Sequence, residues 1–331
     1  MPKRSPDMPE KDLSFARMEL VPLERINSDD DTFQITTRTN VADLLASIPH
    51  DGLLNPPVVI KRRSAFTIVS GFRRIEAYLT LGRAQVVARV LSPDTSNLEC
   101  LRFAIADNAF QRPLNLIESS RALHKLAAHS RSGSAVSESA SSLGLPSNPV
   151  IIKKIRDLCL LPTRIQRAIL DETISLSMAV DLKSLEPHCA AAFAQLFDDL
   201  KLSLNKQREI LTLVSEIARR ESLTAAMVLD GRRLQTILSD PDLDRRQKAR
   251  QLRAYLRQRR FPQIVQAEAK FRDRLRLLNL GNDIQLIPPQ NFEGTTYTVK
   301  MSFDSITRLK ALYTRLDRII QNPALKKILS R

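Results

Sequence analysis

The spacing of apolar residues changes along the chain. Between residues 18 and 91, short strand-like runs alternate with helical patterns, and the clearest run is Ala-Phe-Thr-Ile-Val at 65–69. The run leads into a segment at 73–82 whose apolar residues recur every three or four positions, and Gly82 closes that segment. This spacing is typical of an amphipathic helix. Strands that alternate with helices predict a small α/β domain over residues 18–91.

After Leu91 the strand-like runs stop, and a series of short helical patterns with brief connections follows as far as residue 225. A long basic helix at 242–261 comes next, then two strand-like runs around a proline-rich turn, and an amphipathic helix over 305–329. We therefore predict an α+β fold that is predominantly α. The predicted parts are a disordered arm at 1–17, an α/β domain at 18–91, a helical domain at 92–225 and a small α+β module at 226–331.

The charge balance indicates a polyanionic partner. The chain has 331 residues, with 51 Lys and Arg against 36 Asp and Glu, so its formal net charge is +15. Nucleic acid fits this balance better than an anionic membrane surface, and no apolar run approaches the ~18 residues that a membrane span needs. Three isolated cysteines form neither a metal-ligand spacing nor a paired framework, and the first residues lack the apolar segment of a secretory signal. We expect a cytoplasmic protein without a membrane partner.

The turn between the strand at 65–69 and the helix at 73–82 is a candidate anion site. Backbone amides at a helix start are unpaired and point outward, and Gly71 would let a phosphate approach the main chain. Arg73 and Arg74 can add forked, charge-assisted hydrogen bonds. The alternative is an ordinary helix start with two solvated arginines.

Asp107 and Asn108, further along the chain, offer oxygen ligands of the kind that Mg²⁺ prefers beside phosphate oxygens. A phosphate cradle and a separate Asp-Asn pair together are the set expected for a metal-bound nucleoside triphosphate. Alternatively, the pair makes a local turn or cap between two helices.

These residues belong to a longer pattern that resembles the ParB-like partition protein family. That family shows a Gly-x-x-x-Pro strand entry, a Gly-Glu-Arg-Arg-x-x-Ala box and a Glu-Asn-x-x-Arg…Leu-Asn-Pro-Ile-Glu box. The matching positions are Gly52, Pro56, Pro57, Gly71, Arg73, Arg74, Ala77, Asn108, Leu114, Asn115, Ile117 and Glu118. The resemblance covers residues 18 to 220 of this chain.

The resemblance implies that the N-terminal domain binds CTP with Mg²⁺ and uses the nucleotide to close as a clamp on DNA. It assigns the nucleotide to Ser70, Gly71, Arg73, Arg74 and Asn108, and the metal to Asp107 and Asn108. Phe72 and Asp107 each stand where the family has Glu, and either Gln111 or Arg112 takes the place of the box's arginine. Nucleotide binding is therefore the firmer expectation, and slow CTP hydrolysis stays open. Sulfiredoxins share the fold, but this turn lacks the reactive cysteine that they need.

Residues 134–161 have the layout of a helix-turn-helix. Gly144 permits a tight turn, and Ser147 is placed to cap a second helix whose inward face would carry Ile151, Ile155 and Leu158. The predicted DNA contacts of this segment are Ser147, Asn148, Lys153 and Lys154, with Asn148 reading adenine through a bidentate contact. The alternative is a helical hairpin with solvated lysines.

In the last third of the chain the resemblance thins. The helix at 242–261 is rich in Arg and Lys, and the candidate phosphate contacts on it are Arg245, Arg246, Lys248 and Arg250, with Arg253, Arg257, Arg259 and Arg260 continuing the basic run. The alternative is a solvated linker helix. The strand pair and last helix form a candidate dimerisation module, because ParB relatives usually dimerise through their C-terminal region.

The leading hypothesis is thus a DNA-binding protein of the ParB type, switched by CTP-Mg²⁺ and active in plasmid or chromosome partition. Double-stranded DNA, a second copy of the chain and a ParA-type ATPase are the expected partners. The second hypothesis is a site-specific transcriptional or nucleoid regulator that has lost the nucleotide switch, which Phe72 favours. The third is a phosphotransferase or nuclease on this fold, for which Glu76 is the only nearby candidate base.

Overall fold

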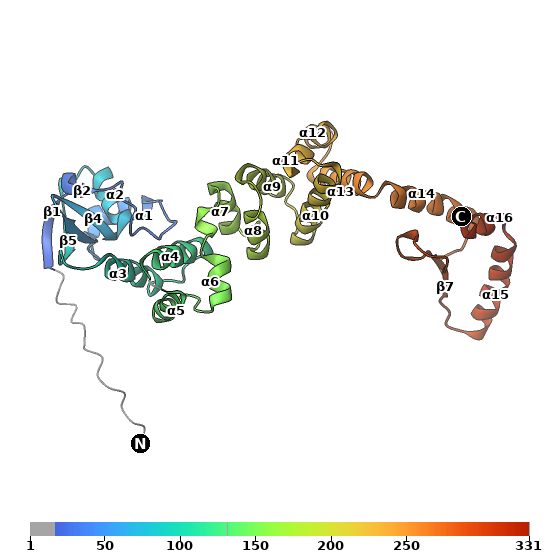
Figure 1. Cartoon of the computed structure of the whole chain (residues 1–331), viewed down its shortest axis with the longest axis horizontal. Coiled ribbons are helices and arrows are strands. Elements are labelled where there is room, and N and C mark those ends of the chain that lie inside the picture. Colours follow the sequence, from blue (N-terminus) through green and yellow to red (C-terminus); the bar gives the residue numbers. More distant parts are fainter. Residues whose placement is uncertain (1–16, 131, 331) are drawn as a thin grey trace, which may run out of the picture. The chain divides into compact units, whose positions relative to one another are not determined.

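The structure, a computed structural model, describes residues 17–130 and 132–330. It divides into two compact units, one as far as Asp198 and the other from Asp199 (Figure 1). The fold is α+β and predominantly α, as predicted. The arm predicted at 1–17 lies outside the described residues except for Arg17, which opens the first strand. The predicted domain boundaries after residues 91 and 225 stay predictions.

The first unit begins with a five-stranded mixed sheet in the order β1-β5-β3-β4-β2. Its strands are β1 (Arg17–Pro22), β2 (Ile26–Asn27), β3 (Val58–Arg62), β4 (Ala65–Ser70) and β5 (Gln85–Leu91). β3 pairs antiparallel with β4 and parallel with β5, and β1 pairs antiparallel with β5 at one edge. The sheet therefore contains a hairpin, β3–β4, and the connection from β4 to β5 crosses over β3.

Helix α2 (Phe72–Thr80) supplies that crossover. Its buried residues are Ile75 and Ala77, and Ile75 joins Val59 and Ile68 of the sheet in one hydrophobic core. The helix ends where the pattern predicted, since Gly82 follows it with φ +64°, a conformation that glycine adopts without strain. Helix α1 (Ala42–Asp51) contacts α2, and the amide of Ala42 is capped by the Asn40 side chain.

The rest of the first unit is helical. It contains α3 (Asn97–Ala109), α4 (Leu116–His129), α5 (Gly133–Ser142), α6 (Pro149–Ile155), α7 (Thr163–Leu170), α8 (Leu176–Lys183) and α9 (Pro187–Asp199). Capping boxes begin α3 at Ser96 and α4 at Asn115. Helix α4 is the centre of this part because it packs against α3, α5, α6 and α7.

The second unit contains α10 (Leu204–Glu221), α11 (Ala225–Leu229), α12 (Arg232–Ser239), α13 (Arg245–Arg260), α14 (Pro262–Leu278), β6 (Ile284–Ile287), β7 (Thr298–Met301), α15 (Ile306–Gln321) and α16 (Pro323–Leu329). The single helix predicted over 305–329 is wrong. Asn322 ends α15 and caps α16, and Pro323 cannot continue a helix because it lacks the amide hydrogen. The two predicted strands form an antiparallel pair, β6–β7.

Across residues 17–130 and 132–330, no helix combines the length and the apolar character that a membrane crossing requires. The three cysteines are free thiols, with Cys100 and Cys189 buried in helices. Burial raises the pKa of Cys100 to about 11, so this thiol behaves as a small core residue.

Candidate functional site

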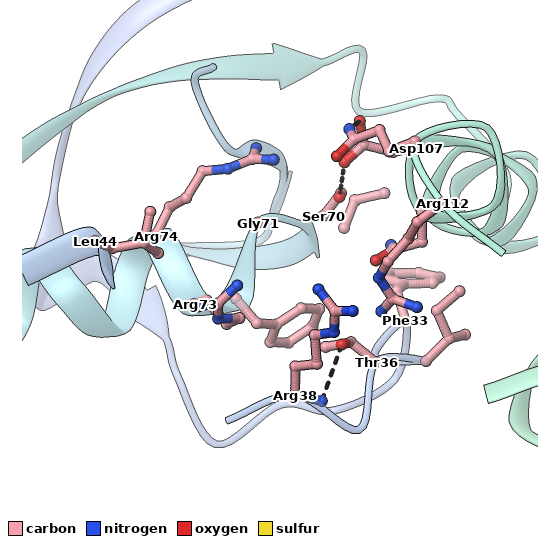
Figure 2. Close-up of a pocket in the computed structure, with 15 residues that line it drawn as sticks. Phe33, Thr36, Arg38, Leu44, Ser70, Gly71, Arg73, Arg74, Asp107 and Arg112 are labelled. Carbon is pink, nitrogen blue, oxygen red and sulfur yellow. Dashed lines mark hydrogen bonds between the residues drawn. The ribbon is translucent and has the colours of Figure 1, made fainter. Parts of the chain in front are cut away.

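A pocket of about 410 Å³ opens where β4 ends and α2 begins (Figure 2). Its walls come from the loop that carries Phe33 to Arg38, from Leu44 of α1, from residues 69–74 and from the end of α3 with the residues after it, 107–112. The predicted residues Ser70, Gly71, Arg73, Arg74, Asp107 and Asn108 all line this one cavity. Segments that are separated in sequence thus contribute to one site of the size usual for small-molecule ligands.

Gly71 makes the sharp turn at the centre of the pocket. Its φ is +92°, and a β-carbon built on it would lie 2.9 Å from the Cα of Pro57 and 2.8 Å from the Pro57 Cβ. No larger residue fits without moving the main chain of the strand entry. The close approach of Pro57 therefore explains why glycine is required at position 71.

The first turn of α2 faces the pocket with unpaired backbone amides. The amides of Arg74 and Ile75 both donate to the carbonyl oxygen of Gly71, so helical hydrogen bonding begins there. The amides of Phe72 and Arg73 precede these bonds and have no intrahelical partner. Such an arrangement favours an anion, and the anion site predicted from the sequence stays a prediction.

Four arginines line the pocket, namely Arg38, Arg73, Arg74 and Arg112, against a single acid, Asp107. Arg73 is held in place: its Nε donates to the carbonyl oxygen of Asn40 at 2.8 Å, and its Nη2 donates to Asp43. This hydrogen bond lowers the pKa of Asp43. Among the described residues no acid forms an ion pair with Arg38 or Arg74, and Arg74 lies on the opposite side of Gly71 from Arg38 and Arg112 in Figure 2.

The side chains of Asp107 and Asn108 both form hydrogen bonds within the protein. Ser70 Oγ donates to Asp107 Oδ2, and Gln111 Nε2 donates to Asp107 Oδ1 at 3.0 Å. The amide Nδ2 of Asn108 donates to the carbonyl oxygen of Ala104 at 2.8 Å, which leaves its Oδ1 for a ligand. Over residues 17–130 and 132–330, no three His, Cys, Asp or Glu side chains come together as metal ligands. A cation here would rely on one carboxylate, one amide oxygen and oxygens of the anion itself.

Behind the pocket, Glu118 of α4 is fully buried and ties three segments together. Arg112 donates to both of its carboxylate oxygens at 2.7 Å, and the amides of Thr37 and Asn115 donate at 2.9 and 3.1 Å. Burial alone would raise the pKa of Glu118, but these hydrogen bonds outweigh it and hold the pKa at about 2. Arg112 therefore lines the pocket with its charge already paired to Glu118. Through the same Glu118, α4 also binds the loop that carries Arg38.

Sequence reasoning missed Arg38 and the neighbouring loop residues Phe33, Ile35 and Thr36. This loop has no regular period, and hydrogen bonds from distant residues hold it: Thr36 and Thr37 donate to Glu118, and Arg121 donates to the carbonyl oxygen of Thr36. The candidate base Glu76 is exposed and does not line the pocket, which removes the residue on which the enzyme hypothesis depended.

The predicted helix-turn-helix contains two helices, α5 and α6, joined by a turn in which Gly144 has φ +69°. Two details are wrong. The cap of α6 is Asn148 rather than Ser147, since Asn148 Oδ1 accepts from the amides of Val150 and Ile151 at 2.9 and 3.4 Å. That oxygen is the one a bidentate contact with adenine would use. Asn148 keeps its Nδ2 for DNA, and contacts by Ser147 and Asn148 stay predictions.

The second wrong detail is one residue of the inward face of α6: Ile155 and Leu158 are buried as predicted, but Ile151 is not. Ile152 and Ile155 are buried, whereas Ile151 is 41% exposed. Ile152, Ile155 and Leu158 follow a three-residue spacing that faces α4, and position 151 lies at the margin of this buried face. Lys153 and Lys154 are exposed, as a contact with DNA requires, and that contact stays a prediction.

In the second unit, the basic residues of α13 fall into two groups. Arg245, Arg246 and Arg250 are exposed, and Lys248 Nζ donates to the carbonyl oxygen of Leu238 at 2.8 Å. The four later arginines form ion pairs, Arg253 with Glu209, Arg257 with Glu268, Arg259 with Glu221 and Arg260 with Glu216. The later group is therefore committed to helix packing, and phosphate contacts by Arg245, Arg246, Lys248 and Arg250 stay predictions.

Comparison with known proteins identifies a known domain in the first part of the chain. The family model of the ParB N-terminal domain matches residues 8–109. A probable chromosome-partitioning protein ParB of Campylobacter jejuni is 33% identical over 76 residues, which is 23% of this chain. The chain spans only about a quarter of the length of that relative, 27%.

Solved structures of ParB proteins are also similar, at low TM-scores. A C-terminally truncated chromosome-partitioning protein ParB of Caulobacter crescentus, complexed with CTP-gamma-S, is 21% identical over 55% of this chain and 99% of that one, with a TM-score of 0.26. The truncated Caulobacter protein complexed to the centromeric parS site is 20% identical over 57% of this chain and 96% of that one, with a TM-score of 0.33. Similarity at this level carries no functional conclusion. The matches to the family model and to the Campylobacter protein show that the chain carries a domain similar to the ParB N-terminal domain over residues 8–109.

Proposed function

We propose that this chain is a DNA-binding partition protein whose N-terminal domain is switched by CTP with Mg²⁺. The observation that carries the proposal is the pocket at Gly71, where unpaired helix amides and four arginines surround a cavity with one acidic lining residue. Such a site favours a ligand with several negative charges. A triphosphate has this character, and CTP is the nucleotide that the family resemblance implies.

The residues present fit a nucleotide with its metal. In the proposed complex the Gly71 turn and the first amides of α2 hold one phosphate, and Arg74 and Arg38 neutralise others. Asn108 Oδ1 and Asp107 would complete the ligands of a phosphate-bound Mg²⁺, which prefers few protein carboxylates. The metal would offset phosphate charge, and Ser70 and Gln111 would fix the direction of the Asp107 carboxylate.

The helical segment α5–α6 is the proposed DNA reader, and exposed Arg245, Arg246 and Arg250 add phosphate contacts in the second unit. A cytoplasmic location on nucleoid or plasmid DNA follows from this role. We assign homodimerisation to the C-terminal module, where Phe303, Ile306, Tyr313 and Ile320 are exposed apolar side chains. A ParA-type ATPase remains an expected partner on the resemblance alone.

Calorimetric titration of the full chain with CTP and Mg²⁺ tests the nucleotide site. We expect Arg74→Ala to weaken CTP binding at least tenfold, since a charge-assisted hydrogen bond contributes about 1.5–3 kcal/mol. Arg83→Ala is the matched control, because Arg83 is exposed just beyond the same helix and does not line the pocket. An unchanged titration with Arg74→Ala would remove the proposed site.

A second candidate function is a DNA-binding regulator without a nucleotide switch. Two observations favour it: Phe72 packs against the core at the pocket edge where the family has a carboxylate, and both oxygens of Asp107 already accept hydrogen bonds. The dissociation rate of the chain from DNA, measured with and without CTP and Mg²⁺, separates the two. Identical rates beside intact DNA binding select the regulator.

A further inference from the structure

The outward face of α6 has an unusual composition for a helix placed to contact DNA. Val150 is 63% exposed and Ile151 is 41% exposed, although both are β-branched apolar residues. The helix has the sequence Pro-Val-Ile-Ile-Lys-Lys-Ile, so it carries no acidic residue, and Lys153 and Lys154 are also exposed. Two adjacent exposed apolar side chains beside two lysines form one mixed surface, which we call the α6 face.

The α6 face is held outward by the packing behind it. Ile152 and Ile155 are buried, and α6 packs against α4 and α5. The end of the helix is anchored as well, because Ser120 Oγ of α4 donates to the carbonyl oxygen of Arg156 at 3.0 Å and accepts from the amide of Cys159 at 2.8 Å. Rotating α6 to bury Val150 and Ile151 would break these contacts, so their exposure is built into the fold.

The positive charge around the α6 face favours a polyanionic ligand. Lys154 lies one helical turn from both Val150 and Ile151, at the spacing of side chains that share a helix face. The nearest acid in sequence after the helix, Asp157, is neutralised by Arg156 and Lys183. Among the described residues Lys153 and Lys154 form no ion pair, and an apolar pair bordered by such lysines fits a ligand whose centre is apolar and whose rim is negative.

The major groove of DNA has this composition where it presents thymine. The C5-methyl of thymine is the one apolar group on the major-groove edges of the bases, and phosphates border the groove. Val and Ile cannot hydrogen-bond, so packing them on a guanine or cytosine edge would leave base donors or acceptors unpaired. Packing them on a methyl group costs no hydrogen bond.

We propose that Val150 and Ile151 read thymine methyl groups, so that the DNA site of this chain has T·A pairs under the first turn of α6. The proposal deepens the proposed function and rests on it, because it requires α6 to enter the major groove. Val150 and Ile151 then determine sequence, while Lys153 and Lys154 contact phosphate and set affinity.

The test uses the full chain and a duplex recovered by repeated selection from a random double-stranded DNA library. Each thymidine of that duplex is replaced in turn by deoxyuridine, which removes only the C5-methyl. We expect one or two positions at which the replacement weakens binding about fourfold, the value for one buried methyl group. At all other positions the ratio of the two affinities should stay near one.

The double variant Val150→Ala/Ile151→Ala should bind the thymidine and deoxyuridine duplexes equally. Leu79→Ala is the matched control: Leu79 is as exposed as Ile151, lies on α2 and should keep the fourfold ratio. A recovered duplex without any methyl-sensitive position overturns the inference, as does a fourfold ratio that survives in the double variant. Failure to enrich any duplex would instead overturn the proposed DNA-binding function itself.

Discussion

The pocket at Gly71 and helix α13 are both rich in arginine, yet the structure uses their guanidinium groups differently. In α13 the four later arginines each meet a glutamate from α10 or α14. In the pocket Arg38 and Arg74 meet no acid among the described residues, and Asp107 is the single acid in the lining. The first set is neutralised within the protein, and the charge of the second set is not neutralised by an acid among the described residues.

This difference shows that a run of basic residues does not by itself indicate a binding surface. Arg253 and Arg259 would be counted as phosphate contacts from sequence, but each is bound by a carboxylate on a neighbouring helix. A charge available to a ligand is one without an acidic neighbour in the fold. The pocket contains two exceptions of its own: Arg73 is paired with Asp43, and Arg112 is paired with buried Glu118.

The largest effect that we expect comes from breaking the pair between Arg112 and Glu118. Glu118→Gln should destabilise helix α4 and the loop at 33–38 by about 3 kcal/mol, because it leaves Arg112 facing a neutral amide in a buried site. Hydrogen exchange of peptides from α4, measured on the full chain, reports this local stability. Hydrogen-exchange protection equal to that of the unmodified chain would show that the pairing of Arg112 with Glu118 does not stabilise α4.

Acid should remove the same stability in the unmodified chain. The folded pKa of Glu118 is about 2, below its ordinary value of 4.5, so the carboxylate stabilises the fold above pH 4.5. That contribution, on the order of 3 kcal/mol, is lost as the pH falls from about 5 to 2. Protection of α4 in Glu118→Gln should lack this part of the pH dependence, and an identical acid profile in both proteins would contradict the assignment.

A smaller difference in stability should distinguish the paired arginines of α13 from the unpaired arginines of the pocket. Arg259→Ala should lower the stability of α13 by about 1 kcal/mol, since Arg259 forms a part-buried ion pair with Glu221. Arg38→Ala should change the stability of its own unit by less than about 0.5 kcal/mol, as is usual for an exposed residue. Local hydrogen exchange on both variants makes the comparison. Equal losses would mean that Arg38 has a structural partner.

The turn at Gly71 could be predicted from the sequence because its causes are local. A strand, a glycine and a helix start follow one another, and the residues themselves fix the geometry. The pocket loop at 33–38 could not be predicted, since Glu118, some 80 positions away, holds it in place. Contacts between distant segments leave no period in the sequence.

The errors in the helical regions have a similar cause. Neighbouring Ile151 and Ile152 have the same chemistry, and only packing against α4 and α5 decides which one is buried. Ser147 and Asn148 are both good caps, and the start of α6 at Pro149 selects the second. In the last helix Pro323 is a local signal for a break, but the amphipathic pattern over 305–329 continues past it and predicts one helix.

The smallest effect concerns the two groups within α13 itself. Arg250 is exposed with no ion pair among the described residues, whereas Arg253, three positions on, is bonded twice by Glu209. If Arg250 contacts phosphate, Arg250→Ala should reduce the slope of log affinity for DNA against log salt by about 0.9, the value for one released counterion. Arg253→Ala should leave the slope unchanged, because its charge is already neutralised. Equal slopes for both variants would place the phosphate contacts of the chain outside α13, while a reduced slope with Arg253→Ala would mean that Glu209 releases its partner when DNA binds.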